Sequence, residues 1–335
     1  MRTKRKCALE YLIVLLVLAI IIISAGTILY FKSFERADFR LGVNFSNAYA
    51  EYLGLDWQKT YLAILDELKV KNIRIAAPWN EIETKKDNWD FSRLDWQVAE
   101  AEKRGVALTV VIGRRTPHWP ECHDPEWIQG LPEEYVVERQ LKMMEKIITR
   151  YKNNKSIEIW QVENEPLLDL FGVCPQGDIG LLRREVSMVK TMDTRPVLIT
   201  DSGELSLWLL AANTGDLFGT TMYRVTYNSI LGYSFYHLPP AFYTIKAWLA
   251  GRAVKDVFVS ELQAEPWSPA GILNTSLEEQ RLSMDAERLI NHVRYARRTG
   301  FGGAYLWGAE WWYWLKQNNN DESLWQAGEK IFKNL

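Results

Sequence analysis

Eight short apolar segments recur along the chain, and amphipathic stretches lie between them. Short apolar runs are typical of strands buried in a parallel sheet, and the i, i+3, i+4 spacing between them is typical of covering helices. This alternation predicts parallel strands joined by crossover helices. The candidate strands are residues 41–45, 73–77, 107–112, 157–162, 196–200, 218–222, 257–260 and 303–307.

The stretches between these strands are predicted to be helical. They are residues 57–71, 94–104, 135–151, 181–192, 240–249 and 276–298. A strand followed by a helix, eight times over, predicts an α/β fold in which the sheet closes into a (β/α)8 TIM barrel. An open doubly wound sheet is the alternative, but no glycine-rich phosphate-binding fingerprint follows the first strand.

A charge-free apolar run, residues 11–31, precedes the predicted barrel. Its 21 residues make about 30 Å of helix, which matches a bilayer core. A cleaved signal peptide is the alternative, but such peptides have shorter apolar regions, and only Ser24-Ala25-Gly26 resembles a cleavage site. Because Arg2, Lys4, Arg5 and Lys6 crowd the amino side, the positive-inside rule places the amino terminus in the cytoplasm.

The sequence therefore predicts four parts. Residues 1–10 form a basic cytoplasmic tail, 11–31 a single-pass transmembrane anchor, 32–39 a short polar linker and 40–335 the barrel domain outside the membrane. Beyond residue 31, 36 basic and 41 acidic side chains give a formal charge of −5. No basic stripe remains, which argues against a nucleic-acid partner.

The three cysteines fall on both sides of the predicted anchor. Cys7 lies on its cytoplasmic flank, whereas Cys122 and Cys174 follow neighbouring predicted strands. An oxidising exterior permits a Cys122–Cys174 bridge, and two unpaired thiols are the alternative. The histidines show no CxxC or HExxH spacing with other ligands, so a zinc site is not supported.

Two predicted strands each deliver a glutamate at their carboxyl end. Glu165 follows the fourth strand within Asn164-Glu165-Pro166, and Glu261 ends the seventh. Functional residues of such barrels gather at this end of the strands. Two carboxyl groups that face each other across a cleft can divide the acid and nucleophile roles in cleaving a glycosidic bond.

Several further segments accompany the two glutamates in a fixed order. They are Ile73-Arg74-Ile75, Trp79-Asn80-Glu81, Trp89-Asp90-Phe91, Trp160 through Pro166, and Leu306-Trp307-Gly308. Together they resemble the retaining glycoside hydrolases of clan A, a superfamily that includes the family 5 cellulases and mannanases. The resemblance spans about residues 40–310, nearly all of the predicted extracytoplasmic part.

The resemblance implies a double-displacement mechanism on a β-linked oligo- or polysaccharide, with no cofactor or metal. Glu165 would be the general acid/base and Glu261 the nucleophile, with the two carboxyls about 5–5.5 Å apart. Arg74 is expected to hold Glu261 as a carboxylate, and a like charge near Glu165 to raise the pKa of Glu165. Residues 40–335 would then be the catalytic domain.

Substrate-binding residues are also implied. Trp307 occupies the position where the clan stacks an aromatic ring under the sugar, and Tyr223 resembles the tyrosine that hydrogen-bonds the nucleophile. Aromatic rings bury the apolar faces of sugars, while polar groups bond their hydroxyls. The candidates are Arg74, Trp79, His118, Asn164, Tyr223, Trp267 and Trp307. Competing carboxylates, for which structural or substrate-contact roles are preferred, are Glu163, Glu265 and Glu310.

The match departs from family 5 in two places. Thr221-Met222-Tyr223 lacks the histidine that family 5 commonly has two residues before the tyrosine, and residues 113–120 match no family 5 segment. These departures leave the sugar open. Two other functions also stay open: a carbohydrate-binding barrel without catalysis, and a transglycosylase in which a sugar attacks the intermediate.

Overall fold

The computed structural model describes residues 11, 13–21, 24, 26–28 and 33–333. The predicted tail 1–10, Cys7 and part of the predicted anchor lie outside the described residues. Within the described residues, no helix has both the length and the apolar character needed to cross a bilayer. Residues 13–21 are helical, and their apolar side chains are exposed.

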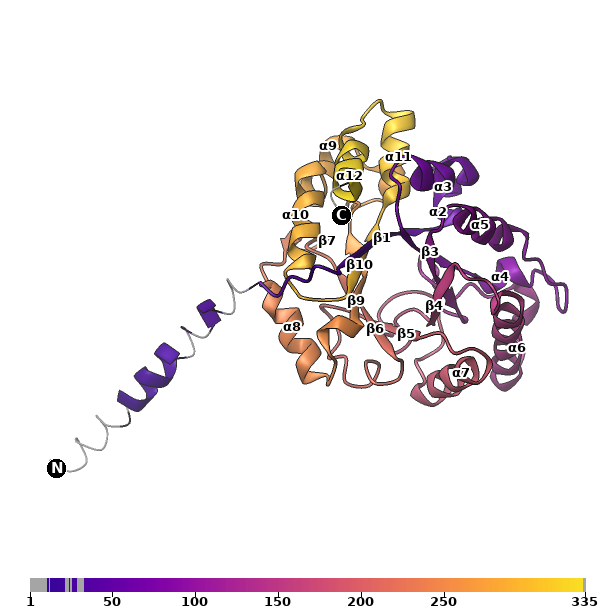
Figure 1. Cartoon of the computed structure of the whole chain (residues 1–335), viewed down its shortest axis with the longest axis horizontal. Helices are drawn as coiled ribbons and strands as arrows, with labels where there is room; N and C mark the ends of the chain where they lie inside the picture. Colours follow the sequence, from indigo (N-terminus) through magenta and orange to yellow (C-terminus); the bar gives the residue numbers. More distant parts are fainter. Residues whose placement is uncertain (1–10, 12, 22–23, 25, 29–32, 334–335) are drawn as a thin grey trace.

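Eight parallel strands close into a barrel in the order β1-β10-β9-β6-β5-β4-β3-β2 (Figure 1). All eight predicted strands are confirmed, with small differences at their ends, and the open-sheet alternative is excluded. The barrel strands are β1 Arg40–Phe45, β2 Asn72–Ala76, β3 Ala107–Ile112, β4 Ile157–Val162, β5 Val197–Asp201, β6 Leu217–Met222, β9 Val257–Gln263 and β10 Gly303–Trp307.

Helices cover the outside of the barrel (Figure 1). They are α2 Asn47–Tyr52, α3 Trp57–Asp66, α4 Trp79–Ile82, α5 Ser92–Lys103, α6 Glu133–Tyr151, α7 Ile179–Met192, α8 Pro240–Leu249, α9 Leu277–Ser283, α10 Ala286–Arg297, α11 Ala309–Asn318 and α12 Ser323–Lys333. The predicted helix 276–298 is wrong as one element. Met284 is extended, and the Asp285 side chain caps a new helix by accepting from the Arg288 amide.

The expected strand–helix alternation is also wrong at one place. Between β5 and β6 the described chain forms turns, with no helix. Trp208 has a φ of 67°, which an α-helix cannot continue, and its buried ring packs on Phe218. A second, unpredicted feature follows β6: the antiparallel hairpin of β7 Val225–Asn228 and β8 Gly232–Phe235.

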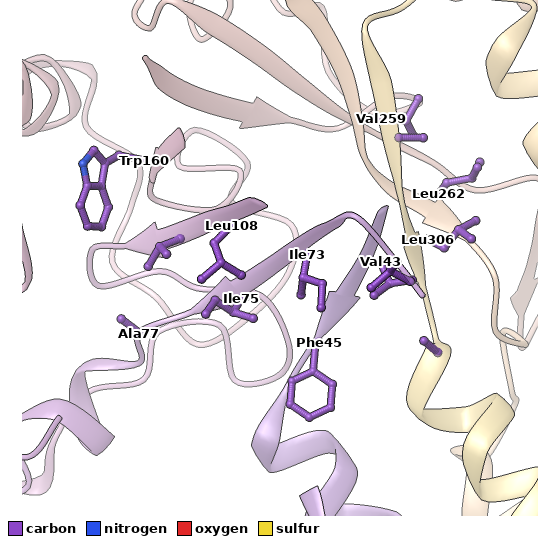
Figure 2. Packing of buried hydrophobic residues seen from close by; sticks show 14 of the residues in the cluster. Val43, Phe45, Ile73, Ile75, Ala77, Leu108, Trp160, Val259, Leu262 and Leu306 are labelled. Atoms are coloured by element: carbon purple, nitrogen blue, oxygen red, sulfur yellow. The ribbon is translucent and has the colours of Figure 1, made fainter. Parts of the chain in front are cut away.

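The barrel strands are buried on both faces, as expected of a parallel sheet under helices. Figure 2 shows Val43, Ile73 and Leu108 projecting from neighbouring strands, and Val259 and Leu306 from the strands that complete the circle. Polar side chains interrupt this apolar packing near the carboxyl ends of the strands. The buried ones include Asn44, Arg74, Gln161, Thr200 and Glu261, and they position the site.

Candidate active site

Glu165 and Glu261 lie at the carboxyl ends of two barrel strands, and each is 6% exposed. Glu261 belongs to β9, whereas Glu165 lies three residues beyond β4. The Glu165 amide donates to Thr200 Oγ1 at 2.9 Å, which fixes the turn after β4. The two carboxyls are close enough to repel each other electrostatically. The barrel therefore brings together the pair that the sequence predicted.

Two donors hold the Glu261 carboxylate. Arg74 Nη1 lies 3.5 Å from Oε1, and the Tyr223 hydroxyl donates to Oε2 at 3.0 Å. Burial raises the pKa of Glu261, while Arg74 and the Tyr223 hydrogen bond lower it. The net direction is upward, so burial outweighs the cation that was expected to dominate. Burial and the charge of Glu261 also raise the pKa of Tyr223 well above its usual range, so its hydroxyl remains a donor.

Arg74 connects the two carboxyl sites. Its guanidinium donates at 2.7 Å to Asn44 Oδ1, Gln161 Oε1 and Asn164 Oδ1. With its side chain almost fully buried, three neutral amide oxygens orient the charged group toward Glu261. The Asn164 side-chain oxygen therefore accepts its hydrogen bond from Arg74 rather than from solvent. Rigid donors of this kind orient a carboxylate before substrate arrives.

Glu165 has a different environment. Within the described part of the chain its Oε1 is buried and has no hydrogen-bond partner. Burial first, and then repulsion by Glu261, raise the pKa of Glu165 well above its usual range. A carboxyl group without donors favours the protonated form. The pair is therefore unequal: Glu261 is held by an arginine and a tyrosine, and Glu165 has a free oxygen.

Glu163 braces the loop that follows β3, residues 113–124 (the β3 loop). Its carboxylate accepts from the Arg114 and Arg115 amides at 2.7 and 2.6 Å. Gly113 has a φ of 125°, and a Cβ there would lie 2.2 Å from Glu163 Oε1, so only glycine fits. Burial raises the pKa of Glu163 to about 7. Glu163 is thus a structural carboxylate.

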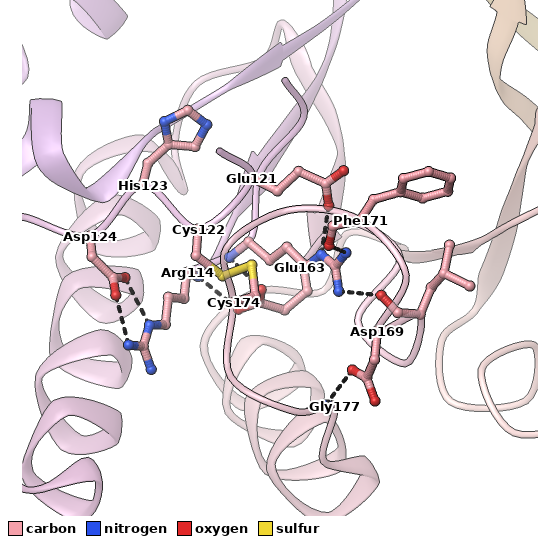
Figure 3. Close-up of a disulfide and its surroundings, with 12 residues drawn as sticks. Arg114, Glu121, Cys122, His123, Asp124, Glu163, Asp169, Phe171, Cys174 and Gly177 are labelled. Atoms are coloured by element: carbon pink, nitrogen blue, oxygen red, sulfur yellow. Dashed lines mark hydrogen bonds and ion pairs between the residues drawn. A yellow bond between two sulfur atoms is a disulfide. The ribbon is translucent and has the colours of Figure 1, made fainter. Parts of the chain in front are cut away.

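A disulfide ties the β3 loop to the loop after β4 (Figure 3). Cys122 and Cys174 are bonded at 2.07 Å, so of the two states that the sequence left open the bridge is the one present. Beside it, Arg115 Nε donates to Glu121 at 2.7 Å. The Glu121 charge raises the pKa of both Glu165 and Glu261. The bridged loop therefore brings a third carboxylate, not predicted from the sequence, toward the pair.

Aromatic rings form one wall of the site. Trp307 stacks on His118 with ring centroids 4.2 Å apart, and His118 stacks in turn on Tyr49 at 5.0 Å. Glu265 fixes this wall by accepting from Trp307 Nε1 at 2.9 Å and from the Tyr49 hydroxyl at 2.7 Å. Burial lowers the pKa of His118 to about 3, so the ring is neutral.

Of the other tryptophans predicted to bind substrate, one lies in the cleft and one in the core. Trp267 meets Tyr223 edge to face at 5.2 Å and lines a cavity with Glu265 and Trp307. Trp79 does not face the cleft: it is fully buried, packs against Trp127 and donates to Glu83. Its predicted substrate contact is therefore wrong, because the turn after β2 directs this ring into the core.

A cavity of about 490 Å³ opens at the ends of β1, β2 and β3. Arg74, His118 and Trp307 line it, together with Tyr49 and Tyr52. Neither Glu165 nor Glu261 is among its lining residues, and the stacked His118 ring covers Trp307 beside it. In the described residues, no cluster of histidine, cysteine and acidic side chains has the arrangement of a metal site.

Solved structures share this barrel. A GH5_18 protein from Bifidobacterium longum subsp. longum, in complex with Manb1-4GlcNAc, is 11% identical with a TM-score of 0.57, over 80% of this chain and 68% of that one. Xylanase 10B from Thermotoga petrophila, in complex with xylobiose, is 14% identical with a TM-score of 0.56, over 89% and 94%.

A beta-galactosidase from Halorubrum lacusprofundi is 13% identical with a TM-score of 0.57, and this chain spans 58% of its length. At such identities the likeness establishes a common fold and does not extend to the sugar. No family model matches the sequence, and no curated protein matches it either.

Sequence reasoning missed several residues of the site. Asn44, Gln161 and Thr200 are polar residues within apolar strands, and that interruption was a readable signal. Glu121 gave no such signal, because its position depends on the disulfide and on the course of the β3 loop.

Proposed function

We propose that this chain is a retaining glycoside hydrolase that cleaves a β-linked oligo- or polysaccharide. The observation that carries the proposal is the unequal carboxyl pair. Glu261 receives hydrogen bonds from Tyr223 and Arg74, whereas Glu165 has a raised pKa and a buried oxygen that has no partner among the residues the structure describes. A nucleophile must be ionised and a general acid must carry a proton. Arg74 and Tyr223 favour the ionised form of Glu261, and burial without a donor favours the protonated form of Glu165, which supports this division of roles.

The proposed reaction has two steps. Glu261 attacks the anomeric carbon while Glu165 gives its proton to the departing oxygen, and a covalent glycosyl-enzyme ester forms. Glu165 is then ionised, so it can take a proton from water. Water attacks the anomeric carbon, Glu261 leaves, and the configuration is retained. Arg74 and the Tyr223 hydroxyl stabilise the charge on Glu261 as it leaves.

Two isosteric substitutions test the assignment. Glu261→Gln removes the nucleophile and Glu165→Gln removes the acid, so each is expected to lower kcat on an aryl β-glycoside by at least about 10²-fold. Glu158→Gln is the matched control, since Glu158 lies on β4 as well but pairs with Arg40 at the exposed amino end. Unchanged turnover in either site variant would refute the role assigned to that glutamate.

The same assays separate the alternatives. A wild-type chain that binds glycans without cleaving any member of a panel of aryl glycosides and β-glucans is a binding protein. Product analysis with an added acceptor sugar distinguishes transfer to sugar from hydrolysis by water. Glycan specificity follows from the same panel.

We further propose that residues 11–31 anchor the chain in a membrane, with the amino terminus in the cytoplasm and the barrel outside. The charge-free run of 21 residues and the four cations before it support this orientation. Exposed apolar side chains along helical residues 13–21 agree with a lipid environment. Alkaline carbonate extraction of membranes tests the anchor: an integral chain stays in the pellet, and release into the supernatant contradicts the proposal.

A further inference from the structure

Four exposed apolar side chains lie on two segments that meet at one end of the barrel. Trp248 and Leu249 end α8 and are 51% and 77% exposed. Leu209 and Leu210 lie in the turns before β6 and are 58% and 63% exposed. We call these four residues the apolar end patch. Exposing such a group of leucines and a tryptophan to water is unfavourable in free energy unless another surface covers them.

Hydrogen bonds join the two segments and place them in the barrel. Asn213 Nδ2 donates to the Ala250 carbonyl at 3.0 Å, just beyond the end of α8. The Asp216 carboxylate accepts from the Val197 amide at 2.9 Å, where β5 begins. The patch therefore lies toward the amino ends of the strands, whereas Glu165 and Glu261 lie at the carboxyl ends.

The chain reaches the barrel at the same place. The Phe34 amide donates to the Arg298 carbonyl at 3.1 Å, and the Phe34 ring meets Trp248 edge to face at 5.7 Å. Figure 1 shows the indigo chain joining the barrel beside α8 and α10. Phe39 is buried as well. The predicted linker is thus attached to the barrel from Phe34 onward and is no free spacer.

This attachment limits the distance between the patch and the proposed anchor. From residue 31 to residue 34 the chain spans about 10 Å at full extension. The headgroup layer on each side of a bilayer is about 5–8 Å thick. If residues 11–31 cross the membrane, Phe34 and the Trp248 ring against it cannot lie far from the headgroups. Tryptophan is also enriched at this depth.

We propose that the apolar end patch rests on the lipid surface and that the barrel stands on the membrane with its carboxylate site facing away. This inference rests on the proposed anchor. In this orientation lipid covers the exposed leucines. The orientation also explains why the linker is short. A barrel seated this way presents its cleft to glycans outside the membrane rather than to the lipid.

Site-specific fluorescence in the full chain tests this orientation. Cys7→Ser removes the unbridged thiol, and Leu249→Cys or Ile230→Cys then adds one labelling site. Ile230 is the matched control, since it is an 87% exposed apolar residue on the hairpin after β6, at the carboxyl end of the barrel. The labelled proteins are reconstituted in phosphatidylcholine–phosphatidylglycerol vesicles. Quenching is measured with nitroxide-bearing lipids and with iodide in the water.

We expect the label at 249 to be quenched by nitroxide lipid and shielded from iodide, and the label at 230 to show the reverse. Equal access of iodide to both labels, in protein that resists carbonate extraction, overturns the lipid contact and leaves the anchor intact. Carbonate release of the chain overturns both. Shielding at 249 with cross-linking between two copies, and no lipid quenching, assigns the patch to self-association and overturns the proposal. Glycosidase assays are independent of all these outcomes.

Discussion

At the scale of single residues, a Tyr223 variant tests whether the tyrosine hydroxyl helps to keep Glu261 ionised. Its hydroxyl donates to Glu261 Oε2 at 3.0 Å. Tyr223→Phe removes this donor and leaves the ring, so the pKa of Glu261 rises further. Because the ionised form is the nucleophile, the acidic limb of the kcat/KM–pH profile should move to higher pH. The loss of one hydrogen bond to a charged group lowers kcat/KM by about tenfold or more.

The pH profile also distinguishes the loss of this hydrogen bond from a general loss of stability. A variant that is only less stable would lose activity without moving the acidic limb. A Tyr223→Phe enzyme whose limb stays at the wild-type pH therefore contradicts the contact with Glu261. The carboxyl of Glu165 has no bond to Tyr223, so the basic limb is expected to keep its position.

His118 gives a second residue-scale prediction, because its ring stacks on one face of Trp307, the residue predicted to stack on a sugar. Such an aromatic pair is worth about 0.5–1.5 kcal/mol. His118→Ala removes this competition and should lower KM for an aryl glycoside by roughly two- to tenfold. His118→Phe keeps a ring in place and is the control, with KM expected near the wild-type value. A higher KM for the alanine variant would instead make His118 a direct substrate contact.

The site could be predicted from the sequence where residues lie on strands. Glu165 and Glu261 follow from their places at or just beyond strand ends, because the strands of a barrel all end at one rim, whereas Arg74 and Tyr223 follow from resemblance. Residues on loops were beyond reach, since a loop's path depends on contacts made far along the chain. Glu121 and the stack of His118 on Trp307 are examples. The burial of Trp79, the first residue of α4, depends on such distant contacts as well.

At the scale of elements, the Cys122–Cys174 bridge joins the loops after β3 and β4 across a sequence separation of 52 residues. Closing a loop of that length restricts the unfolded chain and is worth about 4 kcal/mol on the chain-entropy model. The double variant Cys122→Ser/Cys174→Ser should lose stability of that order, measured as the free energy of unfolding in urea. Cys7→Ser is the control and should match wild type. A loss below about 1 kcal/mol would show that packing alone holds these loops.

Elements were predicted well where local pattern and tertiary packing agree. Eight strands and most helices follow the hydrophobic period, but the segment between β5 and β6 does not become a helix. There, the buried Trp208 ring packs on Phe218, and the ammonium group of Lys246 lies 4.3 Å from its centre. These long-range contacts favour a positive φ at Trp208 over helix. No local pattern contains that information.

At the scale of the whole molecule, buried carboxyls and histidines impose opposite pH dependences on stability. Burial raises the pKa of Glu265 to about 8 and of Glu310 to about 7. Their contribution is complete at pH values below the ordinary glutamate pKa and is lost as the pH rises through 7 to 8. Burial lowers the pKa of His118 to about 3 and of His292 to about 4, so their contribution is lost as the pH falls below the ordinary histidine value.

Glu265→Gln tests how much the buried carboxyls contribute to this pH dependence of stability. Glutamine keeps one oxygen that can accept from Trp307 Nε1, as Glu265 Oε1 does at 2.9 Å, and its amide NH2 can donate to the Tyr49 hydroxyl, which bonds Glu265 Oε2 at 2.7 Å. At pH 5 the wild-type carboxyl is protonated, so the two proteins should unfold at similar urea concentrations. At pH 8.5 the wild type must ionise a buried group, and the variant should be more stable by a few kcal/mol. Exposed Glu278→Gln is the control, expected to follow wild type at both pH values. A Glu265→Gln variant that is equally destabilised at pH 5 and pH 8.5 would mean that the geometry of the hydrogen bonds, and not the charge, sets the contribution of this residue.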